Sequence, residues 1–107
     1  MRAIAYNGSR SSRNVDCLLD VELPAPQPGP SDLLVRVEAV SVNPVDTKVR
    51  RREQPAAEQW RVLGWDVAGV VEAVGPAVQG FRPGDGVWYA GALDRPGCNS
   101  ELHAVDH

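Results

Sequence analysis

The sequence predicts a small, mainly β domain, either a barrel or a sandwich of short strands. Three observations support this class. In Leu33–Ser41, apolar and polar positions alternate, so that Val35, Val37 and Ala39 share one face of a strand. Asp66–Val74 is rich in valine and glycine and has the same period of two. Glycine and proline recur between the strand candidates, as frequent turns require.

Four shorter segments complete the expected set of strands. They are Arg2–Tyr6, Leu18–Leu23, Gly86–Ala90 and Ser100–Val105. The connection at residues 24–30 contains alternating prolines, which donate no backbone hydrogen bond, so we expect an extended crossing of the surface. Arg82–Asp85 fits a tight turn with proline second and glycine third. Gly69, in the middle of a strand, predicts a bulge or the close approach of another segment.

One segment breaks the β pattern. Pro44–Arg52 is expected to form a short helix, because it has proline in its first turn and cations at its C-terminal end. Asn43 then occupies the N-cap, where its side chain would accept a hydrogen bond from an otherwise unpaired backbone N–H. Residues 51–61 are polar and show no pattern, so a mobile excursion is expected there.

Length and charge limit the functional classes. The 107 residues suit one domain, and the net charge of -3 argues against a surface for nucleic acid or anionic membrane. No apolar run approaches the roughly 20 residues of a membrane helix. The N-terminus enters a strand pattern directly and shows no secretory segment, so a cytoplasmic location is expected. The sequence therefore predicts neither a nucleic-acid partner nor a membrane partner.

The two cysteines and two histidines suggest no metal site. Cys17 begins an apolar stretch and is expected to be a small core residue, whereas Cys98 is expected to be a loop thiol. Their spacing matches no metal motif, and a disulfide is not expected in a reducing cytosol. His103 and His107 have no partner at ligand spacing, and we interpret them as surface or strand histidines.

Three stretches occur in a characteristic order: Val40–Arg50 (VSVNPVDTKVR), Leu63–Gly75 (LGWDVAGVVEAVG) and Phe81–Trp88 (FRPGDGVW), the last continuing to Glu101. Together they resemble the medium-chain dehydrogenase/reductase superfamily, in particular its quinone-oxidoreductase and alcohol-dehydrogenase-like members. The resemblance implies a GroES-like partly open β-barrel over residues 1–107, with a short helix near residues 44–52 and normally a Rossmann domain after it. The sequence contains no G-x-G-x-x-G loop, so the cofactor domain is expected to lie outside these residues, in a longer protein.

The resemblance also bears on zinc. Zinc-dependent members take one catalytic ligand from a cysteine where this chain has Asn43, and a second from a histidine where it has Trp65. A neutral amide is a poor ligand for zinc, and an indole offers no available lone pair. Asp66 remains a potential oxygen ligand, but one carboxylate does not make a site. The sequence therefore predicts no metal ligands and no catalytic zinc.

The resemblance implies that Asn43 and Asp46 line the cleft near the nicotinamide. As catalytic residues, Asn43 would hydrogen-bond the substrate or the cofactor carboxamide, and Asp46 would orient neighbouring donors. Lys48 stands where many quinone reductases have tyrosine, and would supply a charged donor to the substrate oxygen. Trp65 would form an apolar wall for a flat substrate. The Arg50–Arg52 run is interpreted as a solvated face rather than a grip on the NADPH 2′-phosphate.

Each of these four residues also has a structural alternative that stays open. Asn43 would be a plain helix cap, and Asp46 a first-turn carboxylate that favours the helix dipole. Lys48 would be an exposed helix lysine, and Trp65 a core aromatic.

The predicted function is the substrate-side domain of an NADPH-dependent, zinc-independent oxidoreductase that reduces a quinone or an α,β-unsaturated ketone. In this interpretation the hydride chemistry belongs to the cofactor, and the isolated domain is inactive. Its open strand edges favour self-association, so a homo-oligomer is expected. Two alternatives stay open: a zinc-type alcohol dehydrogenase with an altered metal site, and a non-enzymatic GroES-like module such as a co-chaperonin subunit.

Overall fold

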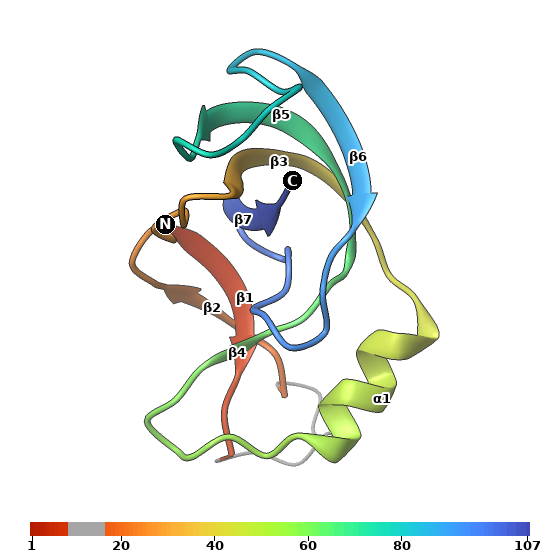
Figure 1. Ribbon diagram of the computed structural model, residues 1–107. Helices are drawn as coiled ribbons and strands as arrows, with labels where there is room; N and C mark the ends of the chain where they lie inside the picture. The colour runs from red at the N-terminus through yellow and green to blue at the C-terminus, as the bar shows by residue number, and fades with distance from the viewer. Residues whose placement is uncertain (9–16) are drawn as a thin grey trace.

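The computed structural model describes residues 1–8 and 17–107, which form seven strands and one helix (Figure 1). In chain order the elements are β1 (Arg2–Tyr6), β2 (Leu19–Glu22), β3 (Asp32–Ser41), α1 (Pro44–Arg52), β4 (Arg61–Val62), β5 (Asp66–Val74), β6 (Gly86–Ala90) and β7 (Leu102–Asp106). The helix has the bounds that the sequence predicts, and the expected strands are present with small shifts at their ends. β4 is an additional strand, which ends the segment expected to be an excursion.

The strands form two antiparallel sheets, with the orders β2-β1-β4 and β6-β5-β3-β7. The larger sheet curves around β7, and α1 lies outside both sheets, beyond the end of β3 (Figure 1). A backbone bridge between Ala3 and Ser100 connects the two sheets. Within the described residues the sheets do not close on each other, which confirms the predicted partly open β-barrel. The helix, at nine residues, is too short and too polar to cross a membrane.

The core consists of three groups of buried apolar residues. One group joins α1 to β1 and to the chain before β5, the second lies in the smaller sheet, and the third lies inside the larger sheet. Their members are, in that order, Tyr6, Val49, Leu63 and Trp65; Ala3, Ala5 and Val62; and Leu33, Val35 and Val71. The first group fixes the position of the helix against the β framework.

β3 is buried only along its first half, which corrects the expectation that Val35, Val37 and Ala39 share one face. Val35 is fully buried, but Val37 is half-buried and Ala39 is exposed. β7 pairs with β3 only from Asp32 to Arg36, so the second half of β3 has a neighbour on one side, β5. The pairing with β5 also shifts register between Val37 and Ala39. A shift of one residue changes which face the side chains occupy.

Two turn and glycine predictions are confirmed. Gly84 has a φ of +96°, as the third position of the predicted turn requires, and the Asp85 N–H donates to the Arg82 carbonyl at 3.2 Å. The Asp85 carboxylate accepts from the Arg82 N–H at 3.0 Å, which further holds the turn. A Cβ at position 69 would lie 2.3 Å from the Arg36 carbonyl oxygen, which explains glycine there by close approach of β3.

The burial of the two cysteines differs from what the sequence predicts. Cys98 lies in a loop but is fully buried, whereas Cys17 is half-buried and lines a cavity. Both are free thiols. Burial raises the pKa of the Cys98 thiol to about 11, so this thiol stays protonated and unreactive at neutral pH.

Residues 91–99 form a loop that polar contacts hold to the barrel. Both terminal nitrogens of Arg95 donate to the Asp32 carboxylate, at 3.0 and 2.7 Å. The Arg61 guanidinium donates to the carbonyls of Leu93 and Arg95, at 2.8 and 3.0 Å. These bonds satisfy groups on an irregular segment that has no ladder to bond to.

His103 on β7 adds a third attachment for this loop. Its Nε2 lies 3.1 Å from the Pro96 carbonyl, and its Nδ1 lies 2.8 Å from the Tyr89 hydroxyl. Because a carbonyl can only accept, Nε2 carries the proton, and the neutral ring accepts from Tyr89 through Nδ1. The Tyr89 and His103 rings also stack, with centroids 5.8 Å apart. His103 is therefore a buried strand histidine, one of the two environments expected for it.

We expect His103 to make the stability of the chain fall as pH falls through about 6.5. Burial, together with the charge of Arg95, lowers the pKa of His103 below its ordinary value of 6.5. The unfolded chain then takes up a proton at a pH where the folded chain does not, so the stabilisation is complete above 6.5 and declines below it. Histidine NMR should show His103 titrating below 6.5. An unchanged pH slope of the unfolding free energy in His103→Gln, between pH 7 and pH 5.5, would contradict the prediction.

Candidate functional site

The site is built around the start of α1. Asn43 lies at the N-cap in an extended conformation, and Pro44 opens the helix. The Asp46 carboxylate accepts from the Asn43 backbone N–H at 2.8 Å, and the Asp46 N–H donates to the Asn43 main-chain carbonyl at 3.0 Å. The two residues therefore form a capping box, in which the Asp46 carboxylate and the Asn43 side chain each face the backbone N–H of the other.

The Asn43 side chain also reaches the start of β5. Its amide nitrogen, Nδ2, donates to the Asp66 carboxylate, and also reaches the Ser41 carbonyl at 3.4 Å. Its oxygen, Oδ1, lies 3.5 Å from the Ser41 hydroxyl, at the limit of a hydrogen bond. Strand pairing produces this contact, because Ser41 and Asp66 are register partners in the β3–β5 ladder. Two residues distant in the sequence thus meet at one end of the sheet.

Asp46 is buried, with an exposed fraction of 6%. One carboxylate oxygen holds the Asn43 N–H, and the other has no hydrogen-bond partner among the described residues. A buried acceptor without a partner is costly to the folded state. Asp46 lines a cavity of about 780 Å³ that also reaches Val42, Leu63 and Asn99.

Lys48 and Arg50 lie in contrasting environments on α1. Lys48 is exposed and makes no hydrogen bond or ion pair with the part of the chain that the structure describes.

Arg50 is 5% exposed, and its guanidinium carbon lies 4.1 Å from the centre of the Tyr6 ring. The expectation of a solvated Arg50–Arg52 run is therefore wrong for Arg50, although Arg51 and Arg52 are exposed. The spacing of Asp46, Val49 and Arg50 marks the inner face of the helix.

Trp65 lies beneath the helix, in the core group with Tyr6, Val49 and Leu63. Its indole is 4% exposed, and its N–H donates to the Ala92 carbonyl at 3.0 Å. Of the two environments expected for Trp65, this geometry favours the core aromatic. A role in substrate binding is then indirect, through the position of α1.

Arg61 is a supporting residue that the sequence did not single out. Its guanidinium lies 5.5 Å from the Trp65 ring, and its Nε forms an ion pair of 2.8 Å with Glu53 at the end of α1. With its bonds to the carbonyls of Leu93 and Arg95, this one side chain connects helix, indole and loop. No periodic signal predicts such a residue, because it follows an irregular polar segment.

Asn43 and Trp65, at the positions where the resemblance implies zinc ligands in other members, do not fit the metal. Asn43 directs its N–H group, not a lone pair, toward Asp66, and Trp65 faces the core. In residues 1–8 and 17–107, no group of three or more histidine, cysteine, aspartate or glutamate side chains could hold a metal ion. Asp66 alone does not supply the set of nitrogen and sulfur ligands that structural and catalytic zinc sites use.

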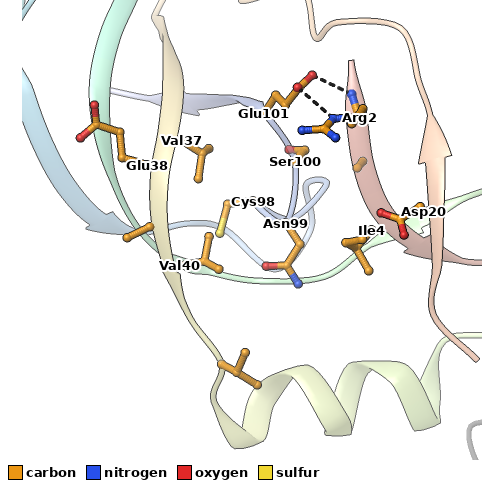
Figure 2. Close-up of a pocket in the computed structure, with 13 residues that line it drawn as sticks. Arg2, Ile4, Asp20, Val37, Glu38, Val40, Cys98, Asn99, Ser100 and Glu101 are labelled. Atoms are coloured by element: carbon orange, nitrogen blue, oxygen red, sulfur yellow. Dashed lines mark hydrogen bonds and ion pairs between the residues drawn. The ribbon is translucent and has the colours of Figure 1, made fainter. Parts of the chain in front are cut away.

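An open groove lies next to this site, between β1 and the second half of β3. Its volume is about 560 Å³, and Figure 2 shows Ile4 and Asn99 on one side and Val37 and Val40 on the other. Glu101 and Arg2 pair at its rim, with 3.3 Å between Arg2 Nε and the Glu101 carboxylate. The groove shares Asn99 with the cavity beside Asp46. Neither opening is lined by Asn43, Lys48 or Trp65.

Comparison with known proteins identifies this partly open barrel with a capped helix after β3. Residues 29–105 match the model of the alcohol dehydrogenase GroES-like domain. The chain belongs to this family, within the medium-chain dehydrogenase/reductase superfamily.

Three relatives illustrate the neighbourhood. A zinc-type alcohol dehydrogenase-like protein of Staphylococcus epidermidis is 38% identical over 106 residues, which are 99% of this chain and 31% of that protein. A Rhizobium etli protein described as a zinc-dependent alcohol dehydrogenase matches at 55% identity with a TM-score of 0.91, over 99% of this chain and 30% of the other. An Escherichia coli quinone oxidoreductase, in complex with NADPH, matches at 27% identity with a TM-score of 0.81, over 99% of this chain and 31% of the other. The chain thus spans about a third of each relative.

Proposed function

We propose that the chain is the substrate-side domain of an NADPH-dependent oxidoreductase that reduces a quinone or an α,β-unsaturated ketone without catalytic zinc. The observation that supports this most directly is the hydrogen bond from Asn43 to Asp66, together with the buried Trp65. These side chains occupy the two positions where zinc-dependent members have a cysteine and a histidine. The relative that binds NADPH is a quinone oxidoreductase, which favours the same assignment.

The proposed roles follow from the exposure of each side chain. Lys48 is exposed and would donate to the substrate oxygen as negative charge develops there. Asn43 would contact the cofactor or substrate, and Asp46 holds the Asn43 backbone N–H in place. Trp65 supports α1 from below. The cofactor supplies the hydride, and we propose that a Rossmann domain outside residues 1–107 binds most of it.

Two alternatives keep some support. The Staphylococcus and Rhizobium relatives carry zinc in their descriptions, which favours an alcohol dehydrogenase, but Asn43 and Trp65 do not fit such a site. A non-enzymatic GroES-like module, such as a co-chaperonin, needs a mobile apolar loop, whereas residues 44–52 form the polar helix α1. A homo-oligomer remains part of our proposal, because the second half of β3 presents an edge that β7 does not cover.

A longer form of the protein, continued past His107 into a cofactor domain, is expected to oxidise NADPH with a quinone or enone acceptor and to keep its activity in the presence of a zinc chelator. Lys48→Ala should lower kcat about 100-fold, the usual effect of removing a donor to a developing oxyanion. Absorbance at the NADPH band measures both results.

Arg52→Ala is the matched control, since Arg52 is an exposed cation on the same helix. It should leave kcat unchanged. Activity that the chelator abolishes and Zn²⁺ restores would instead support the alcohol dehydrogenase alternative. Equal effects of the two substitutions would remove Lys48 from the proposed mechanism.

A further inference from the structure

Asn99 lies just before β7, in a short segment that bonds to both β1 and β3. Its N–H donates to the Leu63 carbonyl and its carbonyl accepts from the Ile4 N–H, both at 2.9 Å. The half-buried side chain makes no hydrogen bond with the described part of the chain. The backbone of Asn99 is therefore fixed, while its side-chain amide keeps its bonding capacity for another molecule.

Gly64 determines which way this amide is turned. A Cβ at position 64 would collide with the Asn99 side-chain oxygen, Oδ1, so that oxygen rests against a residue that carries no side chain. The amide nitrogen, Nδ2, then lies on the other side, and Figure 2 shows the Asn99 side chain in the groove, between Val40 and Ile4. The group that Asn99 offers there is an N–H donor.

Apolar side chains form the walls of this groove, which has a volume of about 560 Å³. Ile4 on β1 and Val40 on β3 are 37% and 42% exposed, although both are large aliphatic residues. They stay open because β7 pairs with β3 only as far as Arg36. A concave apolar surface of this size with few polar groups is typical of a site for a small molecule.

The charged residues at the rim of the groove disfavour anions. Arg2 pairs with Glu101 at 3.3 Å, so this cation is already neutralised. Glu38 pairs with Arg36, also at 3.3 Å. Asp20 lines the same rim and has no cation as a partner in the described part of the chain. A carboxylate or phosphate in the groove would therefore meet an uncompensated negative charge, whereas an uncharged ligand would not.

We propose that this groove binds an uncharged carbonyl compound with an apolar body, and that Asn99 Nδ2 donates a hydrogen bond to the carbonyl oxygen. The apolar body packs against Ile4 and Val40, and Asp20 disfavours anionic analogues. Quinones and α,β-unsaturated ketones belong to this class of ligand. Binding here does not depend on their reduction, however, because Lys48 does not line the groove.

The first experiment compares three ligands of one shape by NMR titration of the 107-residue chain. Benzylacetone carries the ketone, hydrocinnamate has a charged oxygen in place of its methyl group, and isopentylbenzene has a methyl group in place of its carbonyl oxygen. Benzylacetone is expected to bind about 10-fold more tightly than either analogue, because the rim repels the first and the second offers no acceptor. It should also shift the Asn99 side-chain signals. Isopentylbenzene binding as tightly as the ketone, or unshifted Asn99 signals, would overturn the proposal.

The second experiment replaces the donor. Asn99→Asp keeps the shape of the side chain but substitutes an anion for the amide, so it should weaken benzylacetone binding about 10-fold and leave isopentylbenzene binding unchanged. Gln79→Glu makes the same change of charge at an exposed position and should alter neither affinity. Circular dichroism checks that each variant is folded. Equal benzylacetone affinities in the unsubstituted chain and in folded Asn99→Asp would contradict the role of Asn99.

Asp20→Asn tests the rim, and because Asp20 is exposed it tests the site even where Asn99→Asp does not fold. Hydrocinnamate should bind about 3-fold more tightly to this variant, while benzylacetone binding stays the same. Glu58→Gln removes an exposed carboxylate between α1 and β4 and is the matched control. Equal effects of the two substitutions would show that only the overall charge matters, and would overturn the groove as the binding site.

These titrations use no cofactor, so they are independent of the proposed reaction. If benzylacetone binds as expected while the longer protein reduces no quinone or enone, the proposed reaction fails and the groove assignment stands. If the longer protein is an active reductase while Asn99→Asp binds the ketone normally, the groove assignment fails alone.

Discussion

Replacing Trp65 with alanine is expected to lower the free energy of unfolding by about 3–5 kcal/mol, the usual cost of removing a buried aromatic side chain. The indole is 4% exposed and packs with Tyr6, Val49 and Leu63. Its removal leaves a cavity below α1 and also deprives the Ala92 carbonyl of its 3.0 Å hydrogen bond. Urea unfolding followed by circular dichroism measures the loss.

Trp88 provides a matched control on the same scale. It is 87% exposed on β6, so Trp88→Ala should change the free energy of unfolding by no more than about 0.5 kcal/mol. Trp65→Phe keeps a ring in the core and should cost about 1–2 kcal/mol, chiefly for the unsatisfied Ala92 carbonyl. If Trp65→Ala costs no more than Trp88→Ala, the indole is not a core residue, and a wall for the substrate becomes the better assignment.

The second large effect is expected for Arg95→Met, which should lower the free energy of unfolding by about 2–3 kcal/mol at neutral pH. Arg95 donates to both oxygens of Asp32, at 3.0 and 2.7 Å. The side chains are 34% and 12% exposed respectively, so solvent screens part of the pair, and the cost is smaller than for a fully buried one. Removing Arg95 would leave the Asp32 carboxylate with one remaining hydrogen bond among the described residues, from the Gly29 N–H at 2.8 Å.

The pH dependence of this effect has a definite sign. The hydrogen bond from Arg95 is the main reason that the pKa of Asp32 lies below its ordinary value of 3.8. The pair therefore stabilises the chain fully above the unfolded pKa, and this stabilisation is lost as pH falls through the lower folded pKa. The difference between the unsubstituted chain and Arg95→Met should be constant from pH 7 to about pH 5 and should shrink below 4. Arg82→Met, which removes an exposed arginine, is the control, and a difference that stays constant into strong acid would contradict the ion pair.

Local signals in the sequence were sufficient for most of the fold. Proline at position 44 and the cations of Arg50–Arg52 mark both ends of α1, so the helix bounds are correct. Alternation located the strands, and Pro83 with Gly84 located their turn. β4 was missed because two residues carry no period, and their strand conformation depends on pairing with β1.

The environments of several polar and reactive groups could not be derived in this way. Arg50 is buried against Tyr6 although it stands in a run of arginines, and the loop residue Cys98 is fully buried. Burial of such groups depends on what the rest of the chain places over them. Arg61 is the extreme case, since every one of its contacts lies on another part of the fold.

By itself the sequence determined the class of fold and the place of the helix, and it puts an amide and an indole at the two positions where the family resemblance implies zinc ligands in metal-dependent members. Only the tertiary structure decided that the amide of Asn43 meets Asp66, that Trp65 lies under α1, and that Asp46 caps the helix from within. The physical reason is the distance along the chain over which each kind of signal acts. Periodicity and turn chemistry act between neighbours along the chain, whereas the partner of a polar side chain is set by strand register and by the burial that assembly of the whole domain creates.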